Sequence, residues 1–449
     1  MNVAIIGTGY VGLTTGACLA FLGHDVTCVD VAEDKIAALE HGEVPIYEPH
    51  LAELIAGARA HLRFTTDYSQ AIPAAQVVFI AVGTPSSGTG APNLSYLEAA
   101  ARRIGRHLGQ PYTVVVNKST VPIGSGNWVG SLVREAAGER ADCSFAVASN
   151  PEFLREGTAI YDSLYADRVV IGTDEEHAAE VLYTLYRPVL EQTFQAPSYL
   201  PRPEGLGAVP LISTDLQSAE LIKYSANAFL ALKISFINEI GTLAEKVGAD
   251  ITQVAKGMGL DARIGTRFLQ AGIGWGGSCF GKDTAALVST AAEYGLDMPI
   301  VKAAREINRR QRERIVEKLL QELKILKGRT IGLLGLAFKP HTDDLREAPA
   351  IEIARKLVER GVRVRVHDPV AMDRFRREHA DLEVTCCASP FDAARDADAL
   401  VLVTEWPEYR DLDWESVCSS MRTAIVLDGR NVFDKSRMAR AGFRYLCLA

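Results

Sequence analysis

The chain opens with two short apolar runs separated by a glycine-rich turn and a helical stretch. Residues 2–6 read NVAII, and residues 7–12 read GTGYVG. An apolar stretch with helical character then runs from Val11 to Leu22, and residues 25–30 read DVTCVD. A strand, a glycine turn, a helix and a second strand in this order predict a parallel sheet covered by helices. The GxGxxG spacing alone is a weak match, but here a strand pattern precedes it and a helical pattern follows it.

The same alternation continues along the N-terminal part of the chain. Further strand patterns occupy residues 76–82, 113–117 and 144–148, with helical stretches between them. This alternation predicts a mostly parallel, doubly wound sheet. Residues 191–214 contain four prolines and break the pattern, so we interpret them as a linker or surface loop.

The rest of the chain changes character twice. A long helical pattern begins near Asp215, with Ser213 or Thr214 as the expected N-cap, and strand–helix alternation returns after Gly328. We therefore predict an α/β protein with two doubly wound sheet domains joined by a central helical domain that contains a long helix. The expected domains are 1–195, 213–327 and 328–449.

Composition narrows the possible partners and compartment. The 449 residues carry a formal net charge of −8, which argues against a general nucleic-acid or anionic-membrane partner. No apolar run is long enough to span a membrane. The eight cysteines form no CxxC pair and no zinc-ligand pattern, so no metal is expected and the thiols are expected to be reduced. These features favour the cytoplasm.

The first glycine turn is a candidate dinucleotide site. Gly7 permits the tight turn, Gly9 lets a pyrophosphate approach the backbone, and Gly12 lets the helix pack closely. Asp30 ends the second strand, where a carboxylate accepts hydrogen bonds from ribose hydroxyls and repels a 2′-phosphate. The pattern therefore favours NAD over NADP, although the nearby Lys35 weakens that preference. A glycine turn without a cofactor is the alternative.

Three more turns lie beyond the predicted carboxyl ends of strands, where open sheets bind ligands. Thr84 follows the strand at 76–82, Thr120 follows the strand at 113–117, and Glu152 follows the strand at 144–148. Ordinary turn chemistry explains the two threonines equally well. Glu152 is either an acid/base partner or an exposed loop carboxylate.

Residues 274–283, GWGGSCFGKD, are the most informative segment. Their glycines leave Cys279 without bulky neighbours at an expected loop-to-helix junction. Lys282 and a helix N-terminus would both lower the pKa of this thiol, and Asp283 could orient a water. For the other cysteines, burial as small apolar side chains is the better interpretation.

Lys223 and Asn227 are four residues apart on the predicted long helix and therefore share a face. A lysine and an amide on one face can hold an oxyanion or a water. A solvated face is the alternative, but the surrounding sequence is strongly apolar.

Seven motifs together resemble the UDP-glucose 6-dehydrogenase family: GTGYVG, KSTVP, NPEFLREG, AELIKYSANAF, GGSCFGKD, GLAFKPHTDDLRE and DGRN. They run from residue 7 to residue 431, so the resemblance covers nearly the whole chain. It implies two Rossmann-like domains and two successive NAD-dependent oxidations at C6 of a UDP-sugar. It also implies a homodimer in which Arg263 reaches across the interface.

The resemblance implies roles for individual residues. Cys279 would be the nucleophile that forms a thiohemiacetal and then a thioester, and Lys223 with Asn227 would support the oxyanion. Asp283, Thr120 and Glu152 would handle water and protons, and Lys223 alternatively shuttles the first proton. The NAD contacts implied are Gly7, Gly9, Tyr10, Val11, Gly12, Asp30, Lys35, Thr84, Thr120, Glu156, Lys282 and Arg346. The substrate contacts implied are Glu152, Phe153, Leu154, Arg155, Glu156, Lys223, Asn227, Arg263, Phe268, Leu269, Gln270, Ala271, Gly272, Gly276, Lys339 and Arg430.

Gly281 departs from the family pattern, because proline is common at this position. The departure puts the rigidity of the cysteine loop in doubt. Three rival functions remain. The first is oxidation of GDP-mannose by the same chemistry, and the second is a two-electron β-hydroxyacid dehydrogenase with a similar layout. The third is a non-catalytic NAD-binding regulatory protein.

Overall fold

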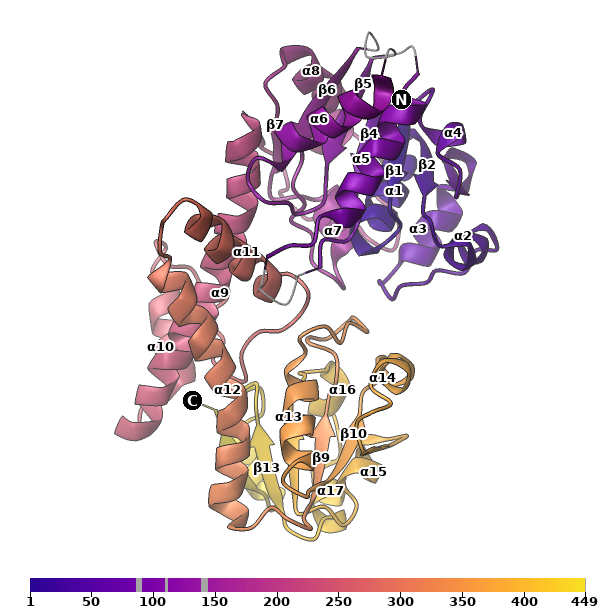
Figure 1. Ribbon diagram of the computed structural model, residues 1–449. Helices are drawn as coiled ribbons and strands as arrows, with labels where there is room; N and C mark the ends of the chain where they lie inside the picture. The colour runs from indigo at the N-terminus through magenta and orange to yellow at the C-terminus, as the bar shows by residue number, and fades with distance from the viewer. Residues whose placement is uncertain (86–90, 110–111, 139–143, 449) are drawn as a thin grey trace. The chain divides into compact units, whose positions relative to one another are not determined.

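The structure is a computed structural model that describes residues 1–85, 91–109, 112–138 and 144–448. The chain forms two compact units (Figure 1). The first contains Met1–Ala226 and Ala285–Tyr294, and the second contains Asn227–Thr284 and Gly295–Ala449. The three domain boundaries expected from the sequence stay a prediction.

Within the described residues, an eight-stranded sheet forms the centre of the first unit. Its order is β3-β2-β1-β4-β5-β6-β7-β8, and neighbouring strands are parallel except for β6 and β7. The connection reverses direction between β1 and β4, the kind of switch point at which open sheets bind ligands. The strands are β1 (Asn2–Ile6), β2 (Asp25–Val29), β3 (Leu62–Thr65), β4 (Val77–Ile80), β5 (Thr113–Asn117), β6 (Phe145–Ser149), β7 (Val169–Gly172) and β8 (Leu211–Thr214).

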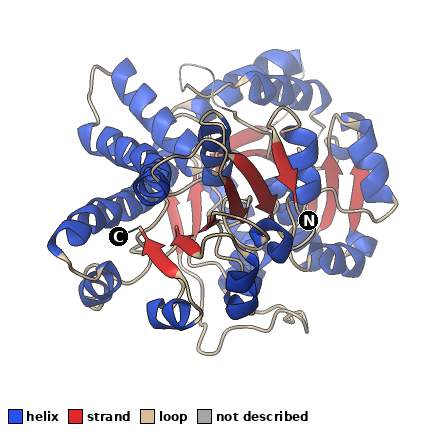
Figure 2. Cartoon of the chain, turned by 90° about the horizontal axis from the view of Figure 1, so that it is seen from below, coloured by secondary structure: helices blue, strands red, loops and turns tan. Residues whose placement is uncertain are grey.

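Helices cover both faces of this sheet (Figure 2). Successive residues of a strand point to opposite faces, so Ile5 packs in one core with Leu13 and Ile6 packs in the other with Ile104. The helices are α1 (Tyr10–Phe21), α2 (Glu33–Glu40), α3 (Leu51–Gly57), η1 (Arg59–His61), α4 (Tyr68–Ala71), α5 (Ser95–His107), α6 (Ser125–Ala137), α7 (Ala159–Leu164) and α8 (Glu176–Leu190).

The proline-rich stretch after α8 is an ordered surface segment. The ring of Phe194 stacks on Tyr165 at 5.8 Å, and the Tyr165 hydroxyl donates to the Leu200 carbonyl at 2.7 Å. The stretch ends in β8, which pairs in parallel with β7 and which the sequence patterns missed. The next helix is capped by Asp215, which accepts from the Ser218 amide at 2.7 Å, and the predicted caps at 213 and 214 belong to β8 instead.

Long helices connect the two sheets along the chain. α9 (Leu216–Val247) begins in the first unit and ends in the second, and it is the long helix that the sequence predicts. α10 (Ile251–Gly259), α11 (Phe280–Glu293) and α12 (Pro299–Leu323) follow. Over the described ranges, no helix combines the length and the apolar run needed to cross a lipid bilayer.

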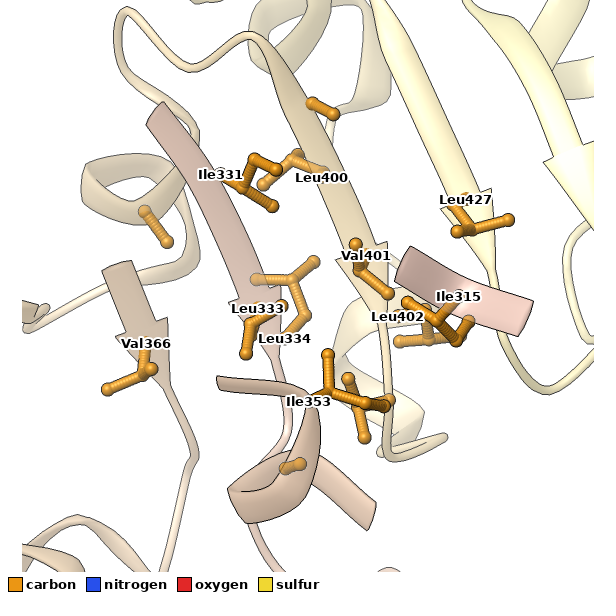
Figure 3. Packing of buried hydrophobic residues seen from close by; sticks show 14 of the residues in the cluster. Ile315, Ile331, Leu333, Leu334, Ile353, Val366, Leu400, Val401, Leu402 and Leu427 are labelled. Carbon is orange, nitrogen blue, oxygen red and sulfur yellow. The ribbon is translucent and has the colours of Figure 1, made fainter. Parts of the chain in front are cut away.

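The second sheet has six parallel strands in the described chain, in the order β11-β10-β9-β12-β13-β14. Its centre is apolar: Ile331, Leu333 and Leu400 pack between the strands and the helices (Figure 3). Its strands are β9 (Thr330–Leu334), β10 (Arg363–His367), β11 (Val384–Cys386), β12 (Ala399–Leu402), β13 (Ile425–Asp428) and β14 (Arg444–Cys447). Its helices are α13 (Pro349–Val358), α14 (Met372–Glu378), α15 (Pro390–Ala394), α16 (Pro407–Arg410), α17 (Trp414–Ser420) and α18 (Lys435–Arg440).

These two sheets and the helices between them confirm the predicted fold class. The second sheet repeats the layout of the first, but its glycine turn is closed. Asp368, which ends β10 as Asp30 ends β2, is 1% exposed and accepts from the amides of Leu336 and Ala337. The indole of Trp406 donates to the same carboxylate at 3.1 Å.

Candidate active site

The first glycine turn has the shape that a dinucleotide requires. Gly7 has a φ of +100°, and a Cβ on Gly12 would lie 1.9 Å from the Gly7 carbonyl oxygen. By contrast, nothing lies within 4 Å of a Cβ built on Gly9, the residue that precedes α1. Gly9 also supplies no side-chain cap, so the amides of the first turn of α1 are available to a pyrophosphate.

Asp30 stands beside this turn as predicted. Its carboxylate accepts from the Thr8 amide at 2.9 Å and hydroxyl at 2.7 Å, and it pairs with Lys35 at 3.2 Å. Burial alone would raise the pKa of Asp30, but the hydrogen bonds from Thr8 and the Lys35 charge outweigh it and lower the pKa below its ordinary value. Asp30 is therefore an anion at neutral pH, as an acceptor for ribose hydroxyls must be.

The structure brings Thr84 and Thr120 together. The Thr84 hydroxyl donates to the Thr120 carbonyl at 2.9 Å, which joins the turns that follow β4 and β5. Ser119 strengthens the same junction by donating to the Val82 carbonyl at 2.6 Å. Both turns lie at the carboxyl edge of the sheet, next in order to the glycine turn after β1.

Glu152 and Lys223 form a buried ion pair. The ammonium of Lys223 donates to the Glu152 carboxylate at 3.0 Å and to the Glu152 carbonyl at 2.6 Å. Both side chains are less than a tenth exposed. The second carboxylate oxygen of Glu152 is buried and has no hydrogen-bond partner among the described residues, so it is suited to hold a water. This rules out the alternative of an exposed loop carboxylate.

Beside this pair lies a buried lysine to which the sequence analysis gave no role. Lys118 donates to the Asn150 side-chain oxygen at 2.8 Å, and the Tyr186 hydroxyl donates to the same oxygen at 2.5 Å. Burial lowers the pKa of Lys118 to about 8, and the charge of Glu152 opposes the shift. The sequence signal that could have identified Lys118 is its position directly after the apolar strand β5.

The loop after Glu152 is held by carboxylates from elsewhere in the first unit. Arg155 makes a two-pronged ion pair with Asp162 at 2.6 and 3.0 Å. Glu48, which sequence reasoning missed, accepts from the amides of Gly157 at 2.6 Å and Ala159 at 2.8 Å. The expected substrate residues Phe153, Leu154 and Glu156 are partly buried in this loop, and Tyr10 and Val11 are partly buried at the start of α1.

In the second unit, Cys279 caps α11. Its carbonyl accepts from the Asp283 amide at 2.8 Å, and the thiol is partly exposed beside the Ser278 hydroxyl at 3.7 Å. Burial raises the pKa of the Cys18 and Cys28 thiols to about 12. Cys279 thus combines access with a helix N-terminus, a setting that favours a reactive thiolate. Cys143 lies outside the described residues.

Asp283 lies at the centre of a buried polar cluster one turn after Cys279. Its side chain is 1% exposed. It accepts from the Asn227 amide at 2.6 Å and from Lys282 at 2.5 Å. The structure therefore brings together three of the residues that the sequence singled out, with α9 supplying the amide and α11 the other two.

The glycines of the cysteine segment lie where side chains would collide. Gly277 has a φ of +85°, and its Cβ would lie 2.7 Å from the Phe338 ring. A Cβ on Gly281 would lie 1.8 Å from a carboxylate oxygen of Glu347, so any side chain here would require Glu347 to move. Arg305 also holds the segment, because it donates to the Gly281 carbonyl at 2.6 Å.

Arg430 anchors this segment to the second sheet. Its guanidinium donates to the carbonyls of Val403 at 2.7 Å, Gly274 at 3.0 Å and Phe338 at 3.2 Å. Most of its donors are therefore engaged with the backbone, and the structure gives Arg430 a scaffolding role beside the substrate contact expected from the sequence.

The other expected substrate residues lie along the same segment or near it. The Gly272 amide donates to Asn238 at 2.7 Å, and a Cβ on Gly276 would lie 2.5 Å from the Glu347 carbonyl oxygen. Leu269 and Ala271 are buried, Gln270 is exposed, and Phe268 has a φ of +65°.

Three expected contacts are basic residues of the second unit. Lys339 lies 5.4 Å from the centre of the Phe338 ring. Arg346 is paired with Asp344 at 2.7 Å, and Arg263 is 89% exposed and paired with Asp261.

Comparisons with known proteins agree along the whole chain. Sequence models of the UDP-glucose/GDP-mannose dehydrogenase family match in three places: the NAD binding domain at 1–190, the central domain at 217–310 and the UDP binding domain at 332–435. The chain is 46% identical to UDP-glucose 6-dehydrogenase TuaD of Bacillus subtilis over 446 residues, covering 99% of this chain and 92% of that protein. It is 47% identical to UDP-glucose 6-dehydrogenase of Rhizobium meliloti over 451 residues, covering 99% and 98%.

A solved structure agrees as well. The UDP-glucose dehydrogenase of Pyrobaculum islandicum superposes with a TM-score of 0.89 at 40% identity, covering 100% of this chain and 97% of that one. A ternary complex of GDP-mannose dehydrogenase from Pseudomonas aeruginosa has a TM-score of 0.53 at 30% identity, with full coverage of both chains.

Proposed function

Since the chain belongs to the UDP-glucose/GDP-mannose dehydrogenase family, whose NAD binding domain forms its N-terminal part, we propose that it oxidises C6 of UDP-glucose to a carboxylate. The alcohol, two NAD and one water would give UDP-glucuronate, two NADH and three protons. Bound NAD supplies the hydride acceptor in both oxidations. The open glycine turn, the anionic Asp30 and the amides of α1 fit this group.

The single observation that carries the proposal is the position of Cys279. Its partly exposed thiol lies at the N-terminus of α11, where the Cys279 carbonyl accepts from the Asp283 amide, one turn before the Asn227–Asp283–Lys282 cluster. A thiolate that adds to the C6 aldehyde forms a thiohemiacetal and keeps the aldehyde from escaping or hydrating. Loss of a second hydride from the same carbon leaves a thioester. Water then cleaves the carbon–sulfur bond, which releases the carboxylate and returns the thiol.

The remaining residues handle charge, protons and water in this scheme. We assign Lys223 and Asn227 to the oxygen of the tetrahedral adduct, where an ammonium and an amide stabilise developing negative charge. Glu152 and Thr120 are assigned to the hydrolytic water, supported by the unpartnered buried oxygen of Glu152. Asp283 is assigned to proton handling beside Cys279.

The other substrate and NAD contacts expected from the sequence are also proposals. The UDP group is assigned to the second sheet by its match to the family's UDP binding domain. In an acidic protein, Lys339 would supply local positive charge for the diphosphate. A reducing compartment such as the cytoplasm is proposed from the spacing of the cysteines in the sequence.

The stoichiometry of NADH tests the reaction type. With limiting UDP-glucose and excess NAD, we expect two NADH for each sugar nucleotide consumed, and UDP-glucuronate as the product. One NADH per substrate would contradict a four-electron oxidation and favour the β-hydroxyacid dehydrogenase alternative.

The substrate is tested by comparison with GDP-mannose. The relatives in the 46–47% identity range are named for UDP-glucose, whereas the solved GDP-mannose enzyme is 30% identical. We therefore expect kcat/KM to favour UDP-glucose by at least about tenfold, since a site built for one base leaves polar groups unpaired with another. A preference for GDP-mannose would reassign the substrate and leave the mechanism in place.

We further propose that the protein is a homodimer formed through α9. Phe229, Phe236, Leu243 and Val247 are 61%, 43%, 59% and 68% exposed. Their spacing of seven, seven and four residues places them on one face of the helix. An apolar stripe of this size on one face typically marks a protein interface. The 89% exposed Arg263 is then available to reach the partner subunit's site.

A further inference from the structure

Glu220, a residue with no part in the scheme above, is buried at the start of α9. Only 3% of the surface of this residue is exposed. One carboxylate oxygen accepts from the Gly124 amide at 2.6 Å and the other from the Gly126 amide at 2.9 Å. Among the described residues, Glu220 has no ion-pair partner within 4.0 Å, so these two backbone bonds are what compensates its burial.

The two amides belong to the N-terminus of α6, which needs an external acceptor. Gly124 is the N-cap of α6, has a φ of +93° and supplies no side-chain cap. The first amides of a helix have no partner within the helix, and the helix dipole favours a negative charge beside them. A Cβ on Gly126 would lie 2.9 Å from Leu216 of α9, so glycine permits the close approach that these bonds need.

The segment that leads into α6 is the turn that carries Thr120. On one side this turn is fastened to the end of β4 by the bonds of Thr84 and Ser119. On the other side Glu220 fastens it to α9, three residues before Lys223. One carboxylate thus connects the Thr120 turn with the helix that carries Lys223.

We propose that Glu220 is a positioning residue whose ionised carboxylate holds residues 118–126 in the conformation that binds NAD. The inference rests on the proposed function only through the role assigned to Thr120. A protonated Glu220 would lose its charge, and its hydroxyl would face an amide that is itself a donor. The turn would then loosen from α9 and present Thr120 less accurately.

The electrostatic setting supports a transition near neutral pH. Burial raises the pKa of Glu220 to about 7, and the two backbone hydrogen bonds oppose the shift. The charged residues nearest along the packed elements are Asp215 just before α9, Lys223 on α9 and Lys118 in the turn. The pKa of Glu220 is set by burial and by the amides of Gly124 and Gly126 rather than by these charges. NAD affinity should therefore weaken as the pH falls through about 7.

The test compares Glu220→Gln with Asp215→Asn, a matched control. Asp215 also accepts from backbone at a helix N-terminus, but it is exposed and does not contact the turn. Two readouts need no turnover: hydrogen exchange of residues 118–126 in the protein alone, and NAD binding by calorimetry. For Glu220→Gln we expect faster exchange in this segment and NAD affinity about tenfold weaker, with a smaller change in affinity between about pH 6 and about pH 8 than the wild type shows. Asp215→Asn should lower Tm only.

Wild-type exchange and NAD affinity in Glu220→Gln would overturn the proposal, and so would equal effects in Asp215→Asn. If Glu220→Gln fails to fold, the wild-type protein provides the test. Its residues 118–126, corrected for intrinsic exchange, should be less protected at about pH 6 than at about pH 8, and unchanged protection and NAD affinity would refute the idea. Because neither readout uses a sugar nucleotide, an error in the proposed substrate would leave the outcome intact.

Discussion

At the scale of single residues, burial distinguishes several of the described thiols from Cys279. Burial raises the pKa of Cys18 and Cys28 to about 12 and also raises the pKa of Cys418 and Cys447, so these thiols stay protonated at neutral pH. Cys279 is partly exposed at a helix N-terminus. Nucleophilic chemistry is therefore expected at Cys279 rather than at these four thiols.

Replacing Cys279 with serine tests this expectation. We expect the production of UDP-glucuronate to fall by about a thousandfold or more, because a hydroxyl neither captures the aldehyde as readily nor forms a labile thioester. Product formation and NADH release are measured together. Cys418→Ser is the control and should retain wild-type turnover. Equal activity in Cys279→Ser would contradict the covalent scheme.

Lys118 yields a prediction about stability and pH. Its pKa is about 8 in the folded protein and 10.5 in the unfolded chain, so between these values the unfolded chain holds a proton that the folded protein lacks. The free energy of unfolding should therefore rise with pH across this window. At about 1.4 kcal/mol per pKa unit, the rise is on the order of 3 kcal/mol.

Denaturant unfolding of the wild type and Lys118→Met at about pH 7.5 and about pH 10 measures this contribution. The wild type should gain stability relative to the variant as the pH increases. A difference between the two proteins that stays constant with pH would show that Lys118 is charged throughout the window.

At the scale of elements, the start of α11 is shaped by the contact between Gly281 and Glu347. Alanine normally stabilises a helix relative to glycine by about 0.5–1 kcal/mol. Here its Cβ would lie 1.8 Å from the Glu347 carboxylate, which must move away from the segment. The two positions should therefore be energetically coupled.

A double-mutant cycle measures this coupling. Gly281→Ala alone should be neutral or destabilising, whereas the same change in a Glu347→Ala background should stabilise by about 0.5–1 kcal/mol. Denaturation of the four proteins gives the coupling energy. If the two changes simply add, Glu347 is not what selects glycine at position 281.

At the scale of the whole molecule, the exposed stripe on α9 predicts an assembly. Substituting Phe236 and Leu243 with glutamate places charges in an apolar interface and should convert the dimer to a monomer. Light scattering coupled to size exclusion measures the mass. Glu239→Lys, an exposed position of the same helix, is the control for surface charge. A double variant that keeps the wild-type mass would place the interface elsewhere.

Local patterns were enough to predict much of this architecture. The strands β1, β2, β4, β5 and β6 and the glycine turn follow from apolar runs and turn residues, and they are as expected. β8 was missed because Leu211–Thr214 is short and largely polar at the edge of the sheet, where only pairing with β7 defines it.

Some residues of the candidate site could also be predicted from local sequence, whereas others could not. Cys279, Asp283 and Asn227 could be singled out because glycines, charge and helix spacing mark them locally. Lys118, Glu48 and Glu220 could not be given roles, because their partners lie 32 to 111 residues away and exist only once the chain has folded. Contacts of this range leave no periodic trace in the sequence.

The closed turn of the second sheet has a consequence for how many dinucleotide cofactors one chain can bind. The two sheets have a similar layout, but Asp368 accepts from the amides of Leu336 and Ala337 and from the indole of Trp406. At 1% exposure, the Asp368 carboxylate is not accessible to the ribose of a second NAD. The two sheets thus resemble each other in layout but differ in function. Because the Asp368 carboxylate points into the protein, we expect each chain to bind one NAD, at the first sheet.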